Sequence, residues 1–431
     1  MNTLKDYKHS VSLDVSRCKG CITCLKRCPT EAIRIRDGRA VIDSERCIDC
    51  GECIRTCPHK AKKSINDKLS QIPFGKKYVI ALPPPSLYGQ FANLDDVDYL
   101  LQGLLDMGFN HVFEVARAAE LVTEYTRLYL SRKDIEHPVI SSACPVVTRL
   151  ISLRFPYLCD NIIPILSPMD IAAKMAKDQA KERHPELSDE DIITVFISPC
   201  TAKTSYVKNG FAGEMNNVDY VVSMSDVYFE LIGIMKKETP PVPVSRVGMI
   251  GMSWAISSGE ASALLNDRYL AVDGIENIIK VLDELETGNY PFLDFVELNA
   301  CSSGCVGGVL TVENPYIAKV KIQNLKRYLP VMQSRYSKEV IANLPEQFST
   351  DMFVMNSVTK SGADMLKAMS VMKQAQEVYA VLPEFDCGAC GSPTCLAFSQ
   401  DVAKGNAVLT DCLMLGRKTK NKNNTEDGDS K

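Results

Sequence analysis

The chain has 431 residues, which at roughly 150 residues per domain indicates two or three domains, and 45% of its residues are hydrophobic, enough for packed cores. Its formal net charge of -4 leaves no overall basic field, so we expect no nucleic-acid partner. The opening sequence MNTLKDYKHS lacks the apolar segment of a signal peptide, and no run approaches the ~18 uncharged apolar residues of a membrane helix. We therefore expect a cytoplasmic protein without membrane insertion.

Cysteine is the most informative residue type in this chain. Its 17 cysteines are too clustered for a disulfide scaffold of this size, and such clustering in a reducing compartment indicates bound metal. All but one of them fall into sets of four with cluster-ligand spacing. The exception is Cys159, for which we expect a buried structural thiol.

Residues 1–66 contain two copies of the pattern C-x2-C-x2-C-x3-C-P, separated by EAIRIRDGRAVIDSERC, which predicts two strands joined at DGR. Three closely spaced thiolates can bind three irons of a cubane, while the fourth cysteine, before proline, reaches the other cluster. We therefore pair the cysteines across the copies: Cys18, Cys21 and Cys24 with Cys57, and Cys47, Cys50 and Cys53 with Cys28. Two zinc sites built from CxxC pairs would not explain this pattern. The region resembles bacterial two-cluster ferredoxins over its whole length, which implies electron transfer through two 4Fe-4S clusters.

Residues 67–335 alternate strand-like runs with amphipathic helical stretches, a pattern that predicts an α/β core with parallel strands. The strand-like runs are KYVIALP, HPVISSAC, DIITVFISPC, VGMIGMSW and FLDFVELNAC. Three of them end in a cysteine: Cys144, Cys200 and Cys301. Because ligands gather beyond the carboxyl ends of strands in α/β sheets, these cysteines could converge on one site.

Three segments of this region supply four thiolates: SSACP with Cys144, SPCTAK with Cys200, and NACSSGCVGG with Cys301 and Cys305. Small residues beside them allow backbone N–H groups to approach cluster sulfurs or anionic ligands, namely Ser141, Ser142, Gly304, Gly307 and Gly308. On spacing alone, a structural 4Fe-4S cluster and a catalytic one fit equally well.

In this order the three segments resemble the signatures TSCCP, MPCxxK and ExMACxxGCxxGGG of FeFe hydrogenases, over about residues 75–320. The resemblance implies an H-cluster domain of two α/β lobes with parallel sheets. It implies a 4Fe-4S cluster on the four central cysteines, with Cys305 also bridging to a diiron subcluster that carries CO, cyanide and a dithiolate. These two parts form the H-cluster. Lys203 takes the family's lysine position, where an ammonium can hydrogen-bond an iron-bound cyanide, and Pro199 also matches.

The chain departs from the family pattern where protons are delivered. Ala143 stands where typical members have a proton-transferring cysteine, and losing such a group costs a factor of ~10² to 10⁴. The acidic pair of the usual proton path is not evident after ARAAEL, where the chain offers Glu120 and Glu124. We predict that Glu260 and Glu297 are relays, although either could be an ordinary surface or capping carboxylate.

Ser198 and Asn299 replace methionines near the diiron unit and make its surroundings more polar. Together with GGVLTVENPYIAK, where typical members have a longer glycine run, these departures resemble the divergent, sensor-type branch of the family, group D in particular. The cofactor's chemistry implies oxygen sensitivity and an anaerobic setting.

The remaining sequence predicts three regions. We expect a helical connector at residues 336–380, a small helical iron–sulfur domain at residues 381–416, and a disordered tail at residues 417–431. The C-terminal cysteines have the spacing C-x2-C-x4-C-x16-C: Cys387, Cys390, Cys395 and Cys412. This pattern resembles the short iron–sulfur domain of electron-transport and corrinoid proteins. A helix over LAFSQDVAKGNA would return the last thiolate to the cluster. Gly388 and Gly391 favour a 4Fe-4S cluster over zinc, and such a cluster would be a second electron port toward a partner protein.

Three functions remain open at this point. The first is an enzyme that slowly interconverts protons, electrons and H2, exchanging electrons with ferredoxin or another redox protein and depending on hydrogenase maturation proteins. The second is an H2 sensor that signals to a regulatory kinase or phosphatase. The third is a 4Fe-4S carrier without a diiron unit, as in eukaryotic cluster assembly, against which Lys203 and the Gly307-Gly308 pair argue.

Overall fold

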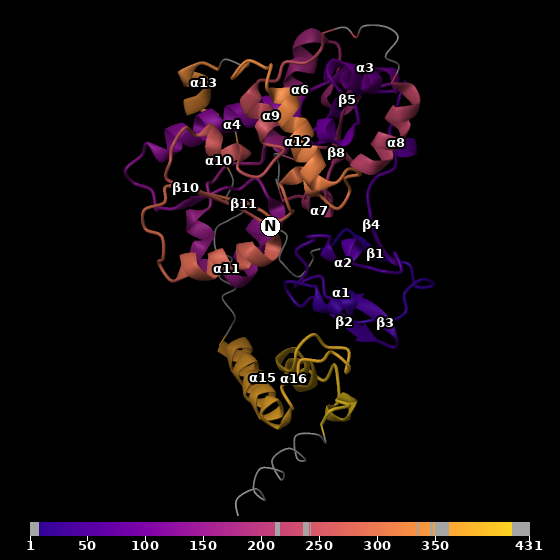
Figure 1. Ribbon diagram of the computed structural model, residues 1–431, viewed down its shortest axis with the longest axis vertical. Helices are drawn as coiled ribbons and strands as arrows, with labels where there is room; N and C mark the ends of the chain where they lie inside the picture. Colours follow the sequence, from indigo (N-terminus) through magenta and orange to yellow (C-terminus); the bar gives the residue numbers. More distant parts are fainter. Residues whose placement is uncertain are drawn as a thin grey trace, which may run out of the picture.

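A computed structural model describes residues 8–211, 216–235, 241, 243–333, 336–344, 348–349 and 362–415. The described chain forms an N-terminal module, a large α/β body and a C-terminal helical domain (Figure 1). The tail predicted for residues 417–431 lies outside the described residues. Within the described ranges, no helix is both long and apolar enough to cross a membrane.

The N-terminal module consists of two antiparallel strand pairs and two short helices. Its elements are β1 (Val11–Leu13), α1 (Thr23–Lys26), β2 (Ile33–Arg36), β3 (Arg39–Ile42), α2 (Glu52–Arg55) and β4 (Lys62–Ser64). Strand β1 pairs with β4, and β2 pairs with β3 in the hairpin predicted around DGR. At the hairpin tip Asp37 and Gly38 have φ values of 49° and 67°, as a tight two-residue turn requires.

Two parallel sheets form the body, which confirms the predicted pair of α/β lobes. The strand orders are β6-β5-β8-β9 and β10-β11-β7. The strands are β5 (Tyr78–Leu82), β6 (His111–Val112), β7 (Val139–Ile140), β8 (Ile192–Ser198), β9 (Tyr220–Ser223), β10 (Tyr269–Asp273) and β11 (Phe295–Asn299). Strands β5, β7, β8 and β11 are the predicted runs, whereas β6, β9 and β10 were not predicted.

Helices cover both faces of the first sheet. The helices of the body are α3 (Asp98–Asp106), α4 (Val115–Leu130), α5 (Pro145–Arg154), α6 (Pro168–Arg183), α7 (Thr201–Lys208), α8 (Met224–Ile234), α9 (Met249–Ser253), α10 (Gly259–Ala263), α11 (Ile275–Glu286), α12 (Pro315–Lys326) and α13 (Lys338–Ala342). Short 3₁₀ segments are η2 (Leu69–Gln71), η3 (Pro85–Gln90), η4 (Pro156–Asn161), η5 (Asp189–Asp191) and η7 (Cys305–Gly307). Side chains alternate across β5, so Ile80 and Leu82 pack with α4 and α6, whereas Val79 and Ala81 pack with α3 and α8.

The prediction of a strand over VGMIGMSW is wrong, because this run forms α9. A short buried apolar run does not distinguish a strand from a helix. Here the helix lies against α4 so closely that a Cβ at Gly251 would be 2.3 Å from the carbonyl oxygen of Ala116. The prediction for Cys159 is confirmed, since its side chain is buried in the core of the second lobe.

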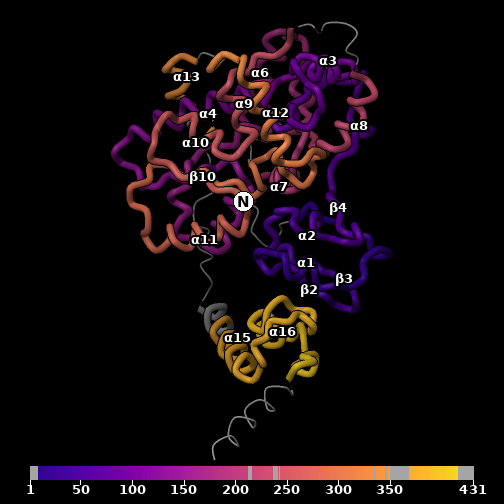
Figure 2. Tube along the Cα trace, viewed as in Figure 1, coloured from indigo at the N-terminus to yellow at the C-terminus, as the bar shows by residue number. Residues whose placement is uncertain are grey.

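The C-terminal domain contains α15 (Gly362–Val381), α16 (Cys395–Ala403) and η8 (Leu409–Asp411). The connector predicted for residues 336–380 includes α13 and most of α15, and residues 345–347 and 350–361 lie outside the described ranges. The end of α15 packs on α16, where Tyr379 and Leu382 contact the core around Phe398. Figure 2 shows this domain beside the N-terminal module, at the opposite end of the molecule from α3 and α6.

Candidate metal centre

The predicted convergence of the central cysteines is observed. Cys144 follows β7 and precedes α5, and Cys200 follows β8 and precedes α7. Cys301 follows β11, and Cys305 begins η7. All four line one cavity of about 90 Å³ at the carboxyl ends of the parallel strands.

Glycines allow the loop that carries two of these cysteines to pack tightly. Gly304 has φ +91°, and a Cβ there would lie 2.5 Å from the backbone nitrogen of Ser257. A Cβ at Gly308 would lie 2.2 Å from the carbonyl oxygen of Pro199. The backbone of the third segment therefore rests directly on the second, and larger residues would force the thiols apart.

Lys203, on α7, is a cation placed among the central thiols. Its Nζ donates a hydrogen bond to the carbonyl oxygen of Ala143 at 3.2 Å. Burial alone would lower the pKa of Lys203, but attraction to the thiolates of Cys305, Cys200 and Cys144 raises it above the ordinary value. The lysine therefore stays charged inside the cavity.

Burial raises the pKa of three central thiols: above the ordinary value for Cys200, well above it for Cys301, and to about 12 for Cys305. Thiolates in such surroundings need compensating positive charge, which Lys203 supplies only in part. Four convergent thiols and one buried ammonium are a donor set that suits a cationic iron core with anionic ligands. The residues present thus fit the group that the sequence implies.

Two buried carboxylates lie beside the thiols. The hydroxyl of Ser141 donates to both carboxylate oxygens of Glu260, at 2.9 and 2.7 Å. Glu297, on β11, accepts hydrogen bonds from the backbone of Ser258 at 2.9 Å and of Ala261 at 2.8 Å. Both carboxylates line the cavity. Burial, and then the charge of Glu297, raises the pKa of Glu260 well above its ordinary value, and burial raises the pKa of Glu297 to about 7.

Comparison with known proteins identifies this architecture. Residues 77–246 and 234–309 match the family described as the iron only hydrogenase large subunit, C-terminal domain, over more than half of the chain. The chain belongs to the iron-only hydrogenase family. Residues 10–58 match a 4Fe-4S dicluster domain, and residues 382–414 match a putative Fe-S cluster domain. The chain is therefore an iron–sulfur protein related to oxidoreductases.

Curated relatives match different parts of the chain. The periplasmic [Fe] hydrogenase large subunit of Nitratidesulfovibrio vulgaris is 26% identical over 370 residues, covering 70% of this chain and 86% of the relative. The corrinoid/iron-sulfur protein large subunit of Moorella thermoacetica is 53% identical over 36 residues, 8% of each chain. Among solved structures, an apo [FeFe]-hydrogenase of Chlamydomonas reinhardtii has a TM-score of 0.49 and 18% identity, covering 66% of this chain and 95% of that one.

Within this hydrogenase-family site, the residues that depart from the family pattern have different surroundings. Ala143 and Asn299 line the cavity, and the Asn299 amide donates to Glu297 at 2.6 Å. Ser198 is fully buried, and its hydroxyl donates to the carbonyl oxygen of Cys200 at 2.7 Å instead of lining the cavity. Of these two residues, Asn299 contributes polarity to the cavity lining and Ser198 does not.

Glu120, within ARAAEL, and Glu124, shortly after it, are not among the residues that line the cavity. Glu120 is buried and accepts a hydrogen bond from the backbone of Gly248 at 2.7 Å. Glu124 pairs with Arg127 on the same helix. Both carboxylates therefore have partners away from the central thiols.

Asp170, on α6, was not predicted from the sequence. Its Oδ2 accepts a hydrogen bond from Ser167 at 2.8 Å, and burial raises its pKa to about 6. Its charge also contributes to the raised pKa of Lys203. In the sequence, Ser-x-x-Asp at the start of a helix indicates capping, so the effect of Asp170 on the charge of Lys203 could not be predicted.

The N-terminal thiols form the two predicted sets of four. Cys28 lines one small cavity with Cys47, Cys50 and Cys53. After burial, the charge of Cys28 is the largest contribution that raises the pKa of Cys50. The thiols of the other set are likewise neighbours: Cys18, Cys21, Cys24 and Cys57.

One N-terminal cysteine also reaches the central site. Cys50 lines the central cavity as well as the N-terminal one. The guanidinium of Arg149, on α5, donates to the carbonyl oxygen of Cys47 at 2.7 Å. The hydroxyl of Thr201, next to Cys200, donates to the carbonyl oxygen of Asp49 at 2.7 Å. These contacts join the second N-terminal set to the central thiols.

The C-terminal cysteines gather around the N-terminus of α16. Cys390, Cys395 and Cys412 share the small core of this domain. Burial raises the pKa of Cys390, and the charges of Cys412 and Cys387 add to the effect. The cysteines brought together are therefore those predicted.

Proposed function

We propose that this chain interconverts protons, electrons and H2 at an H-cluster, slowly, with electrons carried by 4Fe-4S clusters. The observation that carries the proposal is Lys203. An ammonium held at this position is suited to an anionic ligand of a second metal unit.

The chain would hold the cofactor with residues from three segments. Cys144, Cys200, Cys301 and Cys305 would bind a 4Fe-4S cluster, and Cys305 would also bridge to the diiron subcluster. Lys203 would hydrogen-bond a cyanide ligand, with Pro199 and Asn299 closing the pocket. When bound, the diiron subcluster would supply the metal site at which protons and electrons combine to form H2. In cells, hydrogenase maturation proteins would deliver it.

We propose that the carboxyl pair replaces the missing cysteine relay. The methyl side chain of Ala143 has no proton to give. The backbone N–H of Ala143 donates a hydrogen bond to the hydroxyl of Ser141 at 3.2 Å, and that hydroxyl donates a hydrogen bond to Glu260. Because burial raises the pKa values of Glu260 and Glu297, the pair holds a proton near neutral pH and can exchange it. The longer route makes proton delivery slow.

Electrons would pass through the N-terminal module. Cys50 lines both the N-terminal cavity and the central one. The cluster bound by Cys28, Cys47, Cys50 and Cys53 would therefore exchange electrons directly with the central site. A ferredoxin or another redox protein would be the external partner. We propose a cytoplasmic location for this chain, whereas the relative from Nitratidesulfovibrio vulgaris is named periplasmic.

A second candidate is an H2 sensor acting through a kinase or phosphatase. Alanine at position 143 favours it, because slow proton delivery limits turnover but leaves H2 binding possible. The sensor would use the same cofactor, so the two functions differ in rate and partner. A 4Fe-4S carrier is the remaining alternative.

The test is anaerobic reconstitution of the full chain with iron and sulfide, with and without a synthetic diiron cofactor. We expect protein-bound CO and cyanide bands in the infrared spectrum only when the diiron cofactor is added, together with slow H2 evolution from a reduced viologen. The absence of protein-bound bands, with the 4Fe-4S clusters present, would leave only the carrier.

A further inference from the structure

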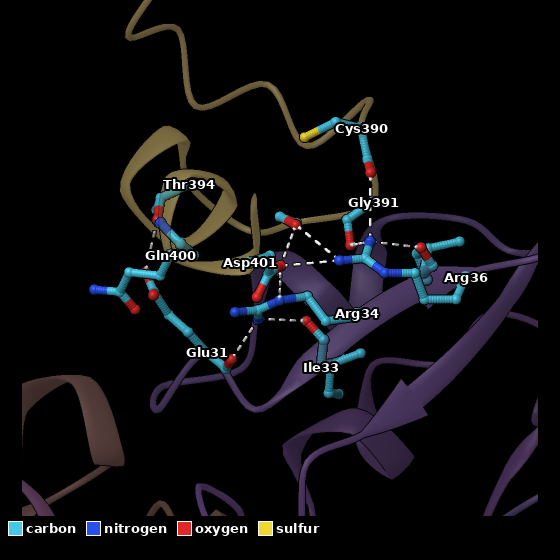
Figure 3. A network of polar contacts seen from close by, with 12 residues as sticks. Glu31, Ile33, Arg34, Arg36, Cys390, Gly391, Thr394, Gln400 and Asp401 are labelled. Atoms are coloured by element: carbon cyan, nitrogen blue, oxygen red, sulfur yellow. Dashed lines mark hydrogen bonds and ion pairs between the residues drawn. The ribbon is translucent and has the colours of Figure 1, made fainter. Parts of the chain in front are cut away.

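The C-terminal domain lies against one face of strand β2 (Figure 3). The sequence of β2 is IRIR, so its side chains alternate between two faces. Ile33 is buried in the core of the N-terminal module, and Arg34 and Arg36 are on the opposite face. In an isolated ferredoxin-like module these arginines would be solvated, but here α16 covers them.

A single carboxylate oxygen joins the two arginines. Asp401 Oδ2 accepts hydrogen bonds from Arg34 Nε at 2.6 Å, from Arg36 Nη2 at 2.9 Å and from the hydroxyl of Ser392 at 2.7 Å. The side chains of Arg34 and Asp401 are only 14% and 11% exposed. Because the charges are largely withdrawn from water, removal of the carboxylate would leave two uncompensated guanidinium groups.

The backbones of the two domains also meet. The backbone N–H of Ile35 donates to the carbonyl oxygen of Gly391 at 2.8 Å. Gly391 has φ +80°, and a Cβ there would lie 2.2 Å from the carbonyl oxygen of Ile35. Only glycine allows this approach.

The contact extends to α1, between two predicted cluster ligands. Lys26 lies between Cys24 and Cys28, and its ammonium donates to the carbonyl oxygens of Asp386 and Pro393. A Cβ at Gly388, next to Cys387, would lie 3.4 Å from the side chain of Leu25. The loop that carries Cys387 and Cys390 thus packs against the segment between Cys24 and Cys28, which are ligands of different N-terminal sets.

The outer side of the C-terminal set stays accessible. Leu413 follows Cys412 directly and is 73% exposed. The domain therefore contacts the N-terminal module near Cys387 and Cys390 and reaches solvent near Cys412, which is partly exposed, as an electron port requires.

We propose that the C-terminal domain is an electron port docked on β2 by the clamp of Arg34, Arg36 and Asp401. The proposal rests on the proposed function, in which both regions hold 4Fe-4S clusters. A reduced ferredoxin-type protein would give one electron to the C-terminal cluster. That electron then passes to an N-terminal cluster, so that the C-terminal cluster is reoxidised as the N-terminal one is reduced. Asp401 is a positioning residue that holds the two clusters at transfer distance.

The test compares Asp401→Arg with wild type in the full, anaerobically reconstituted chain. Asp401→Glu keeps the charge and should restore the wild-type behaviour. Glu377→Gln is the matched control, because it removes one exposed carboxylate from α15 of the same domain. Hydrogen–deuterium exchange of residues 31–42 reports docking, and stopped-flow reduction of the N-terminal clusters by a reduced two-cluster ferredoxin reports electron transfer.

In Asp401→Arg, we expect exchange at Ile35 to rise, and reduction of the N-terminal clusters to slow, by at least about tenfold each, with iron content unchanged. Unchanged exchange would overturn the docking, and faster exchange with unchanged reduction would overturn the port. Wild-type protein that binds no iron at the C-terminal cysteines would instead refute the proposed clusters, while the exchange measurement still tests the contact.

Discussion

The central cavity and the clamp between the C-terminal domain and β2 both join segments far apart in the chain, but different interactions hold them. The cavity is closed by backbone packed on backbone around thiols, with buried carboxylates and one ammonium inside. The clamp depends on charged side chains at a largely polar contact, as is usual between domains of one chain. A change in the cavity should therefore affect cofactor binding and chemistry, whereas a change in the clamp should affect only the supply of electrons.

The largest expected effect is that of Lys203→Gln. Without the ammonium, the diiron unit loses its hydrogen-bond partner, so the CO and cyanide bands and H2 evolution should fall to background after reconstitution. Lys208→Gln is the matched control, because Lys208 is exposed near the end of the same helix and pairs with Asp67. Normal bands in Lys203→Gln would remove the main support for a diiron pocket.

Replacing the buried carboxylates tests the proton path. Glu260→Gln and Glu297→Gln should each lower H2 turnover at least about tenfold, because an amide cannot exchange the proton, while infrared bands persist. Glu124→Gln, outside the cavity, should turn over at the wild-type rate. Equal rates in all variants would mean that protons reach the site by another route.

Two glycines offer the sharpest comparison of the regions. A Cβ would lie 2.2 Å from the Pro199 carbonyl oxygen at Gly308, and 2.2 Å from the Ile35 carbonyl oxygen at Gly391. We expect Gly308→Ala to reduce cofactor loading severalfold, because the loop that carries Cys305 must shift. Gly391→Ala should leave the infrared bands intact and release the C-terminal domain, measured by exchange at β2. Equal loss of bands in both variants would contradict the division between cavity and clamp.

The smallest expected effect is on pH-dependent stability. Burial raises the pKa of Glu297 from 4.5 to about 7, so the folded state holds this proton more tightly than the unfolded state. The resulting stabilisation is complete below pH 4.5 and is lost as the pH rises through about 7. Between pH of about 4.5 and 7, the thermal midpoint of wild type should therefore fall relative to that of Glu297→Gln. Parallel curves would show that the carboxyl group titrates normally.

The cysteine sets could be predicted because cluster geometry constrains ligand spacing within a few residues, as in the repeat that ends at Cys28. Strands β5, β8 and β11 could also be predicted, since their apolar runs end at a cysteine or begin the α/β core. The helix α9 was not, because a buried helix of five residues has no periodicity that separates it from a strand. The contact between Arg34 and Asp401 could not be predicted either. The two residues are 367 positions apart, and the sequence around each indicates only a solvated charge.

The central claim is that the cavity activates H2, and isotope exchange tests it without any electron partner. Reconstituted wild-type protein under H2 in D2O should release HD slowly into the gas phase. The Lys203→Gln variant should release none above a blank that contains the free synthetic cofactor. Wild-type protein that shows the infrared bands but forms no HD would contradict the account.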